Sequence, residues 1–140
     1  MPRASASREL LSSREDVWAF IAEPHHFSDW WPGIGGVQPD RRGLAEGARW
    51  GISGADRPTL LRRATSSGML LVRGVQTPER FAWTLTGDHI DAELRLEERG
   101  PNRTMATLDV EAPWLYGRSR ALPRRALTRL HALCQTAAEL

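Results

Sequence analysis

The feature that most constrains the fold is a long stretch of alternating apolar and polar residues, from Val37 to Ala112. Alternation at a period of two places apolar side chains on one face of a β-sheet and polar side chains on the other. This pattern is typical of an antiparallel sheet, because a parallel sheet is usually covered on both faces. The clearest inward positions are Ala48, Trp50, Ile52, Phe81, Trp83, Leu85, Ile90, Ala92, Leu94, Leu96, Ala106, Leu108 and Val110. The stretch predicts a sheet with one apolar face that another element must cover.

Two segments of this stretch, residues 60–65 and 69–76, are expected to be strands, but their alternation does not fix which side chains point inward. A shift of one residue would move Arg63 and Arg73 from solvent to the interior. Their orientation therefore stays open at this level. Turns are expected at residues 77–79, 87–88 and 100–102, where proline, glycine, aspartate and asparagine gather.

The covering element is a helix at the C-terminal end, beginning near Gly117 or Leu122, with Pro123 in its first turn or at a kink. Apolar residues at helical spacing form two adjacent stripes. The first consists of Leu122, Ala126, Leu130, Leu133 and Ala137, and the second of Leu127, His131, Cys134 and Ala138. A face this broad predicts that the helix lies across the apolar face of the sheet.

The N-terminal part predicts a strand over residues 3–11 and a helix that follows Ser13. Ser13 can cap that helix, with Asp16 three residues further on. Glu23 and Pro24 end it, because the residue before a proline avoids the helical region and proline has no amide to donate. Residues 25–30 are expected to form a second short helix or turn, stopped by Pro32. The order of elements predicts an α+β fold.

Length and composition limit the remaining possibilities. A chain of 140 residues is large enough for one core, so residues 1–140 are expected to form a single domain. No apolar run reaches the roughly 18 residues of a membrane span. The N-terminus lacks the apolar segment of a secretion signal, and the single cysteine, Cys134, has no partner for an internal disulfide. Both observations predict a cytoplasmic protein.

The charge pattern argues against a nucleic-acid partner. All 19 basic residues are arginine, but 17 acids leave a net charge of only +2. The arginines are scattered, with one cluster near the C-terminal helix that is interpreted as a solvated helix face. Its members are Arg118, Arg120, Arg124, Arg125 and Arg129.

Two segments resemble a known superfamily. The stretch SRELLSSREDVWAFIAEPHHFSDWWPGI, residues 7–34, is similar to the N-terminal pattern of the SRPBCC (START-like, helix-grip) superfamily, with a strand, a Val-Trp helix, a proline turn and a Trp-Pro pair. TPERFAW, residues 77–83, is similar to that superfamily's proline turn into an Arg-aromatic-Ala-Trp strand. Within the superfamily the chain looks closest to the polyketide cyclase/dehydrase-like branch.

This resemblance implies a curved antiparallel sheet of about six or seven strands wrapped around the long C-terminal helix, with two short helices after the first strand. It also implies a cavity between sheet and helix that takes a small hydrophobic or aromatic molecule. Aromatic side chains suit both cores and apolar pockets. The expected ligand-binding residues are Phe27, Trp30, Trp31, Trp50, Trp83, Trp114, Tyr116, Leu127 and His131. We expect one of Trp30 and Trp31 to be buried and the other to lie at the rim.

Residues capable of catalysis are few. His25 and His26 are adjacent, so their side chains diverge, and neither a metal nor another cofactor is expected. Cys134 is expected to be a buried, inert thiol. The residues that could supply acid-base chemistry are Tyr116, His131, Arg63 and Arg73.

Three functional hypotheses follow. The first is binding of a small hydrophobic or aromatic molecule by a monomer or homodimer. The second is a polyketide aromatase/cyclase that uses general acid-base groups for aldol cyclisation and dehydration. The third is a protein-interaction module with a vestigial cavity, in which the arginine-rich C-terminal helix contacts a partner.

Overall fold

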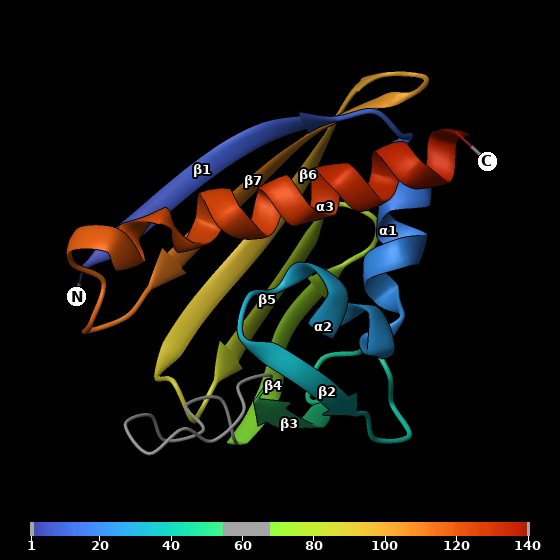
Figure 1. The fold of residues 1–140 in the computed structure, drawn as a ribbon. Coiled ribbons are helices and arrows are strands. Elements are labelled where there is room, and N and C mark those ends of the chain that lie inside the picture. The colour runs from blue at the N-terminus through green and yellow to red at the C-terminus, as the bar shows by residue number, and fades with distance from the viewer. Residues whose placement is uncertain (1, 55–67, 140) are drawn as a thin grey trace.

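The computed structural model describes residues 2–54 and 68–139 (Figure 1). Within them the chain forms a seven-stranded antiparallel sheet, a long C-terminal helix and short helical segments after the first strand. The strands are β1 (Arg3–Leu10), β2 (Ile34–Gln38), β3 (Arg49–Gly54), β4 (Gly68–Gln76), β5 (Arg80–Leu85), β6 (Ile90–Gly100) and β7 (Arg103–Glu111). The helices are α1 (Arg14–Ala22), α2 (Phe27–Trp30) and α3 (Leu122–Glu139), with 3-10 turns η1 (Pro24–His26) and η2 (Gly117–Ala121).

The strand order is β1-β7-β6-β5-β4-β3-β2, so the first strand closes one edge beside the last. Ala4 of β1 lies opposite Val110 of β7, which in turn lies opposite Ala92 of β6. All three side chains are buried on the inner face. The predicted alternation is confirmed along β5, β6 and β7, where the neighbouring polar residues face outward.

Helix α3 covers this inner face, crossing the strands in Figure 1. Its buried residues are Leu122, Pro123, Ala126, Leu127, Leu130 and Cys134, which confirms the broad apolar face expected from the sequence. Pro123 sits in the first turn, where its missing amide has no helical partner to lose. The helical residues begin at Gly117 as a 3-10 turn and continue as α-helix from Leu122.

The segment between β1 and β2 follows local rules. Ser13 is the N-cap of α1, and its side chain accepts a hydrogen bond from the Asp16 amide at 3.2 Å. Pro24 begins η1 directly after α1. His26 Nδ1 donates to the Phe20 carbonyl oxygen at 2.7 Å, and its ring stacks on Phe20. These contacts hold the chain as it turns back toward the sheet with α2.

The structure shows which side chains of β4 point inward, a point that the sequence left undetermined. Leu70 and Val72 point inward, and the pairing with β5 shifts register between Val72 and Gly74. Arg73 lies at this irregularity and points to the outer face, where it contacts Asp91. The predicted strand at residues 60–65 and Arg63 lie outside the described residues. None of the described helices is long and apolar enough to cross a membrane.

The packing of α3 gives a direct test of how the fold is stabilised. Leu130 is completely buried between α3 and the sheet, whereas Leu11 is 43% exposed. We expect Leu130→Ala to lower the free energy of unfolding by about 2–5 kcal/mol because it leaves a cavity. Leu11→Ala, the same change at an exposed site, should cost less than about 1 kcal/mol. Urea denaturation of both variants measures the difference, and similar losses would contradict this account of the core.

Candidate ligand site between the sheet and the helices

Six aromatic side chains form one cluster beneath the short helix α2. Helix α2 and its C-cap contribute Phe27, Trp30 and Trp31, β3 contributes Trp50, and β5 contributes Phe81 and Trp83. Each is at most 1% exposed. Phe27 contacts Trp83 edge-on, with ring centroids 5.7 Å apart, and Phe81 lies 4.5 Å from Trp83. Edge-to-face arrangements such as that of Phe27 and Trp83 are a favoured packing of aromatic rings. The cluster therefore joins α2 to the middle of the sheet.

The expectation that only one of Trp30 and Trp31 is buried was wrong, since both are 1% exposed. Helix α2 ends at Trp30, and the backbone of its C-cap residue, Trp31, is extended. This change of backbone conformation lets the two neighbouring rings enter the interior at 84° to each other, with centroids 5.8 Å apart. Trp31 stacks on Phe27, while Trp30 meets the same ring edge-on.

Two indole N–H groups of this cluster have no hydrogen-bond partner among the described residues. They are Nε1 of Trp30 and Nε1 of Trp83, and both atoms are buried. The two rings lie 5.9 Å apart at 86°. A buried donor without an acceptor costs about 1–3 kcal/mol, so such groups are rare in native proteins and call for a water molecule or a ligand.

Trp50 provides the contrast within the same cluster. Its side chain is buried like those of Trp30 and Trp83, but its Nε1 donates to the Gly43 carbonyl oxygen at 2.9 Å. Burial of a tryptophan in this cluster therefore does not by itself leave its N–H group without an acceptor. Trp30 and Trp83 differ from Trp50 in lacking one within the described part of the chain.

The other expected ligand-binding residues lie along α3 and the segment before it. Leu127 is buried against the sheet. Trp114 is 40% exposed and donates from Nε1 to the Asp88 carbonyl oxygen at 2.6 Å. Tyr116 is 68% exposed. Only Leu127 of these three has its side chain in the interior. The exposed Trp114–Tyr116 segment is therefore not part of the buried aromatic cluster.

His131 lies at the edge of the interior, half-buried on α3. Its Nδ1 is 3.5 Å from Nη2 of Arg8. Because a guanidinium only donates hydrogen bonds, Nδ1 must be the acceptor, which places the proton of a neutral ring on Nε2. Burial, and secondarily the positive charge of Arg8, lower the pKa of His131 below its usual value. At neutral pH the residue is thus an uncharged contact between α3 and β1.

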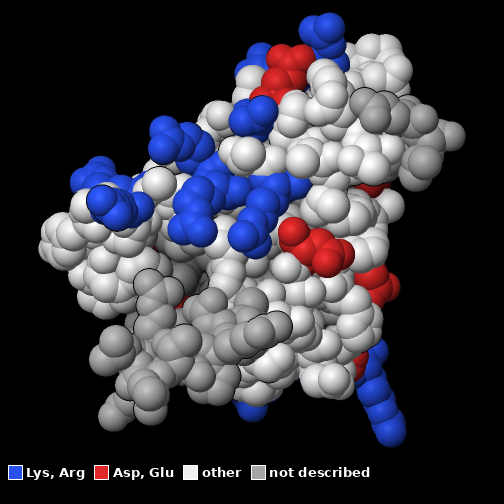
Figure 2. Space-filling model, in the orientation of Figure 1, with Lys and Arg blue, Asp and Glu red and all other residues white. Residues whose placement is uncertain are grey.

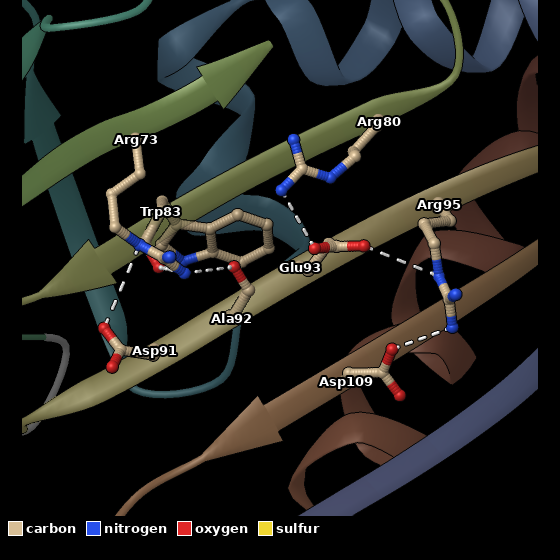
Figure 3. A network of polar contacts seen from close by, with 8 residues as sticks. All are labelled: Arg73, Arg80, Trp83, Asp91, Ala92, Glu93, Arg95 and Asp109. Atoms are coloured by element: carbon tan, nitrogen blue, oxygen red, sulfur yellow. Dashed lines mark hydrogen bonds and ion pairs between the residues drawn. The ribbon is translucent and has the colours of Figure 1, made fainter. Parts of the chain in front are cut away.

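The outer face of the sheet carries a network of ion pairs (Figure 3). Glu93 contacts Arg80 at 3.1 Å and Arg95 at 3.7 Å, and Arg95 also contacts Asp109 at 2.8 Å. Arg73 lies 3.9 Å from Asp91. It also donates to the carbonyl oxygens of Trp83 and Ala92, at 3.2 and 3.4 Å. Arg73 therefore serves the sheet's outer surface and does not reach the inner face.

Three hollows are lined by described residues, and none of these three lies between the inner face and α3. Two open hollows of about 500 and 540 Å³ are lined mainly by residues whose side chains point outward from the sheet, among them Asp91 and Asp109 in the first and Arg95 and Thr107 in the second. The third, near Ile34 and Met69, holds only about 10 Å³. The cavity implied between sheet and helix stays a prediction.

The structure does not bring the candidate catalytic residues together. Tyr116 is exposed before η2, His131 lies on α3 beside β1, and Arg73 lies on the opposite face of the sheet. Arg63 lies outside the described residues. No group of three or more metal-ligating side chains occurs in residues 2–54 and 68–139. His25 is exposed and His26 is used to hold α1, as described above.

Comparison with known proteins identifies the architecture. XoxI from Bacillus cereus superposes with a TM-score of 0.73 at 12% identity, over 99% of both chains. A START superfamily protein from Mycobacterium smegmatis superposes with a TM-score of 0.62 at 14% identity, over 97% of this chain and 95% of its own. This chain has the START-like helix-grip fold.

A protein from Nitrosospira multiformis has the same fold, with a TM-score of 0.71 at 16% identity over 99% of this chain and 100% of its own. No protein-family model matches the sequence, and no curated protein matches it. The helix-grip fold expected from residues 7–34 and 77–83 is thus confirmed, while these distant likenesses leave the function to be argued from the site.

Sequence reasoning placed Trp30 and Trp83 among the ligand-binding residues but gave no sign that their N–H groups lack an acceptor in the described part of the chain. The partner of a buried indole depends on which backbone carbonyl lies opposite, as Gly43 does for Trp50. The spacing of residues in the sequence does not reveal which carbonyl a buried indole will meet in the folded protein.

The buried thiol of Cys134 yields a prediction about pH. Burial raises the pKa of Cys134 from 9.0 to about 11, with a hydrogen bond to Ser12 acting in the opposite direction. Between roughly pH 9 and 11 the unfolded chain has lost a proton that the native protein retains, so stability should fall as the pH rises through this window. Thermal unfolding of wild type and Cys134→Ala should therefore show a steeper decline in the wild type. Equal declines of stability in the two proteins would show that the raised pKa of Cys134 is not the cause.

Proposed function

We propose that this protein binds a small apolar or aromatic molecule bearing an acceptor oxygen, held between the sheet and helices α2 and α3. The observation that carries the proposal is the pair of buried indole N–H groups, of Trp30 and Trp83, that find no acceptor among the described residues. An acceptor placed against either group would remove the desolvation cost that it otherwise bears. The surrounding rings supply the apolar contact surface that small-molecule sites require.

The polarity of the site supports an uncharged ligand. The cluster around Trp30 and Trp83 consists of aromatic rings, with the aliphatic core of the sheet and α3 around it. Apart from Thr104, whose hydroxyl donates to the Ser12 carbonyl oxygen, the core residues in the described part of the chain are apolar. A charged ligand would lose its hydration there without a counter-ion. A ketone, quinone, ester or phenol fits this environment better than an acid or an amine.

Binding at this place requires α2 to move, because the rings are packed against one another. Helix α2 is four residues long, with Pro24 upstream and Pro32 downstream. A short element between two prolines can shift without breaking a long helix or a strand pairing. The ligand then takes the space that this shift opens beside the indoles of Trp30 and Trp83.

The cyclase alternative has less support. Cyclisation by general acid-base groups needs a proton donor or acceptor within hydrogen-bond reach of the bound substrate. Tyr116, His131 and Arg73 lie apart from one another and from the aromatic cluster. The proposal is therefore binding without chemical conversion of the ligand.

The test compares two rigid probes of the same shape, fluorenone and fluorene, of which only the first carries an acceptor oxygen. We expect calorimetric titration to show tighter binding of fluorenone, by about two- to tenfold, because one net hydrogen bond is worth about 0.5–1.5 kcal/mol. Trp30→Phe and Trp83→Phe remove the N–H and keep an aromatic ring. At least one of these variants should lose the preference for fluorenone while still binding fluorene.

Trp50→Phe is the matched control, because the indole that it removes is buried in the same cluster but already has an acceptor. This variant should retain the preference for fluorenone even if its stability falls. Absence of binding of either probe to the wild-type protein would overturn the interior site. Equal affinity for the two probes would refute the role of the indole donors.

A further inference from the structure

The C-terminal end of the chain differs in charge from the rest, in a way that the interior site does not explain. Residues 113–138 contain five arginines and no acid, whereas residues 1–112 contain sixteen acids and fourteen arginines. The net charge of +2 thus conceals a basic end and a slightly acidic remainder. The basic segment comprises η2 and most of α3, which are adjacent in the fold.

The arginines of this segment gather with one arginine of β1 on the outward side of α3. Arg8 lies beside α3, because its guanidinium donates to the Thr128 hydroxyl at 3.5 Å. Figure 2 shows basic side chains gathered on the face of the molecule that α3 crosses, with few acidic side chains among them. We call this surface the arginine face. It consists of Arg8, Arg118, Arg124, Arg125 and Arg129, all exposed. Arg120 is left out because it lines the hollow on the outer face of the sheet.

Carboxylates in the described part of the chain do not neutralise the arginine face. Among the side chains described, those of residues 2–53 and 68–136, no carboxylate forms an ion pair with any of its five guanidinium groups. Arg80 and Arg95 on the sheet, by contrast, each contact Glu93. Mutually repelling cations kept together on one surface raise the local potential and favour an anionic partner.

Two exposed aromatic side chains come just before η2, four and two residues ahead of Arg118 in the chain. Trp114 and Tyr116 are 40% and 68% exposed. The Ser119 hydroxyl accepts a hydrogen bond from the Tyr116 amide at 2.9 Å and lies 2.9 Å from the Trp114 carbonyl oxygen. The Trp114 indole is fixed by its hydrogen bond to the Asp88 carbonyl. The two rings are therefore presented to solvent by a well-connected turn.

We propose that the arginine face, together with Trp114 and Tyr116, docks on an anionic phospholipid surface. Arginine interacts favourably with anionic headgroups, and tryptophan and tyrosine prefer the boundary between headgroups and acyl chains. This inference is independent of the interior site.

The shape of the surface favours a membrane over a nucleic acid. Single-stranded nucleic acids are usually held in a positively charged groove. Here the arginines stand on the outward side of a helix whose other side is buried, and the described hollow lined by Arg120 also contains Asp91, Glu93, Asp109 and Glu111. Phosphates entering that hollow would meet carboxylates. A bilayer would contact only the arginine face and would not enter the hollow.

The experiment is co-sedimentation of the full chain with vesicles of phosphatidylcholine alone or mixed with phosphatidylglycerol. We expect binding only to the mixed vesicles, weakening as sodium chloride is added, because salt screens exposed charges. Each arginine near such a surface contributes about fivefold in affinity. The double variant Arg124→Gln, Arg125→Gln should therefore bind about 25-fold more weakly.

The matched control is Arg41→Gln, Arg42→Gln, which removes two adjacent exposed arginines elsewhere on the chain and changes the net charge equally. It should bind nearly as well as the wild type. Equal losses in both double variants, or no binding of the wild type to mixed vesicles, would overturn the proposal. Binding to single-stranded RNA or polyglutamate but not to vesicles would also overturn it and assign the face to that class of partner. Thermal unfolding of both variants checks that they are folded, which is expected because the four side chains are exposed.

Discussion

The structure depends on covering one apolar face of a curved antiparallel sheet. Strands β5, β6 and β7 turn aliphatic and aromatic side chains to one side, and α3 covers part of that side through Ala126, Leu127 and Leu130. Helix α2 covers another part with Phe27 and the tryptophans at its end. Burial of apolar surface is the main favourable term in folding, so these contacts position everything else in the molecule.

Much of this arrangement could be predicted from the sequence, because period-two alternation and helical stripes are local signals. The capping of α1 by Ser13 and its end at Pro24 are equally local, and both were confirmed. The orientation of Arg73 was not predictable, since it follows from a register shift between β4 and β5. Burial of both Trp30 and Trp31 depends on the extended backbone at Trp31, which the adjacent Pro32 does not by itself reveal.

The candidate site was only partly predictable for the same reason. The abundance of tryptophan indicated an aromatic interior, but the partner of each indole depends on the backbone that the fold places opposite it. Trp50 finds the Gly43 carbonyl, whereas Trp30 and Trp83 find no acceptor in the described part of the chain. Whether a buried indole has an acceptor depends on the tertiary structure. It distinguishes a packed core from a site where a polar atom of another molecule would be stabilising.

The ion pairs on the outer face link several strands at once. Glu93 lies directly opposite Asp109 in the pairing of β6 with β7, so two like charges face each other across the strands. Arg95 contacts both carboxylates, and Arg80 contacts Glu93 as well. Reversing the charge at any one of these positions would leave repulsion that a change at a neighbour must relieve. These four positions should therefore vary together during evolution, as one unit that spans β5, β6 and β7. They are Arg80, Glu93, Arg95 and Asp109.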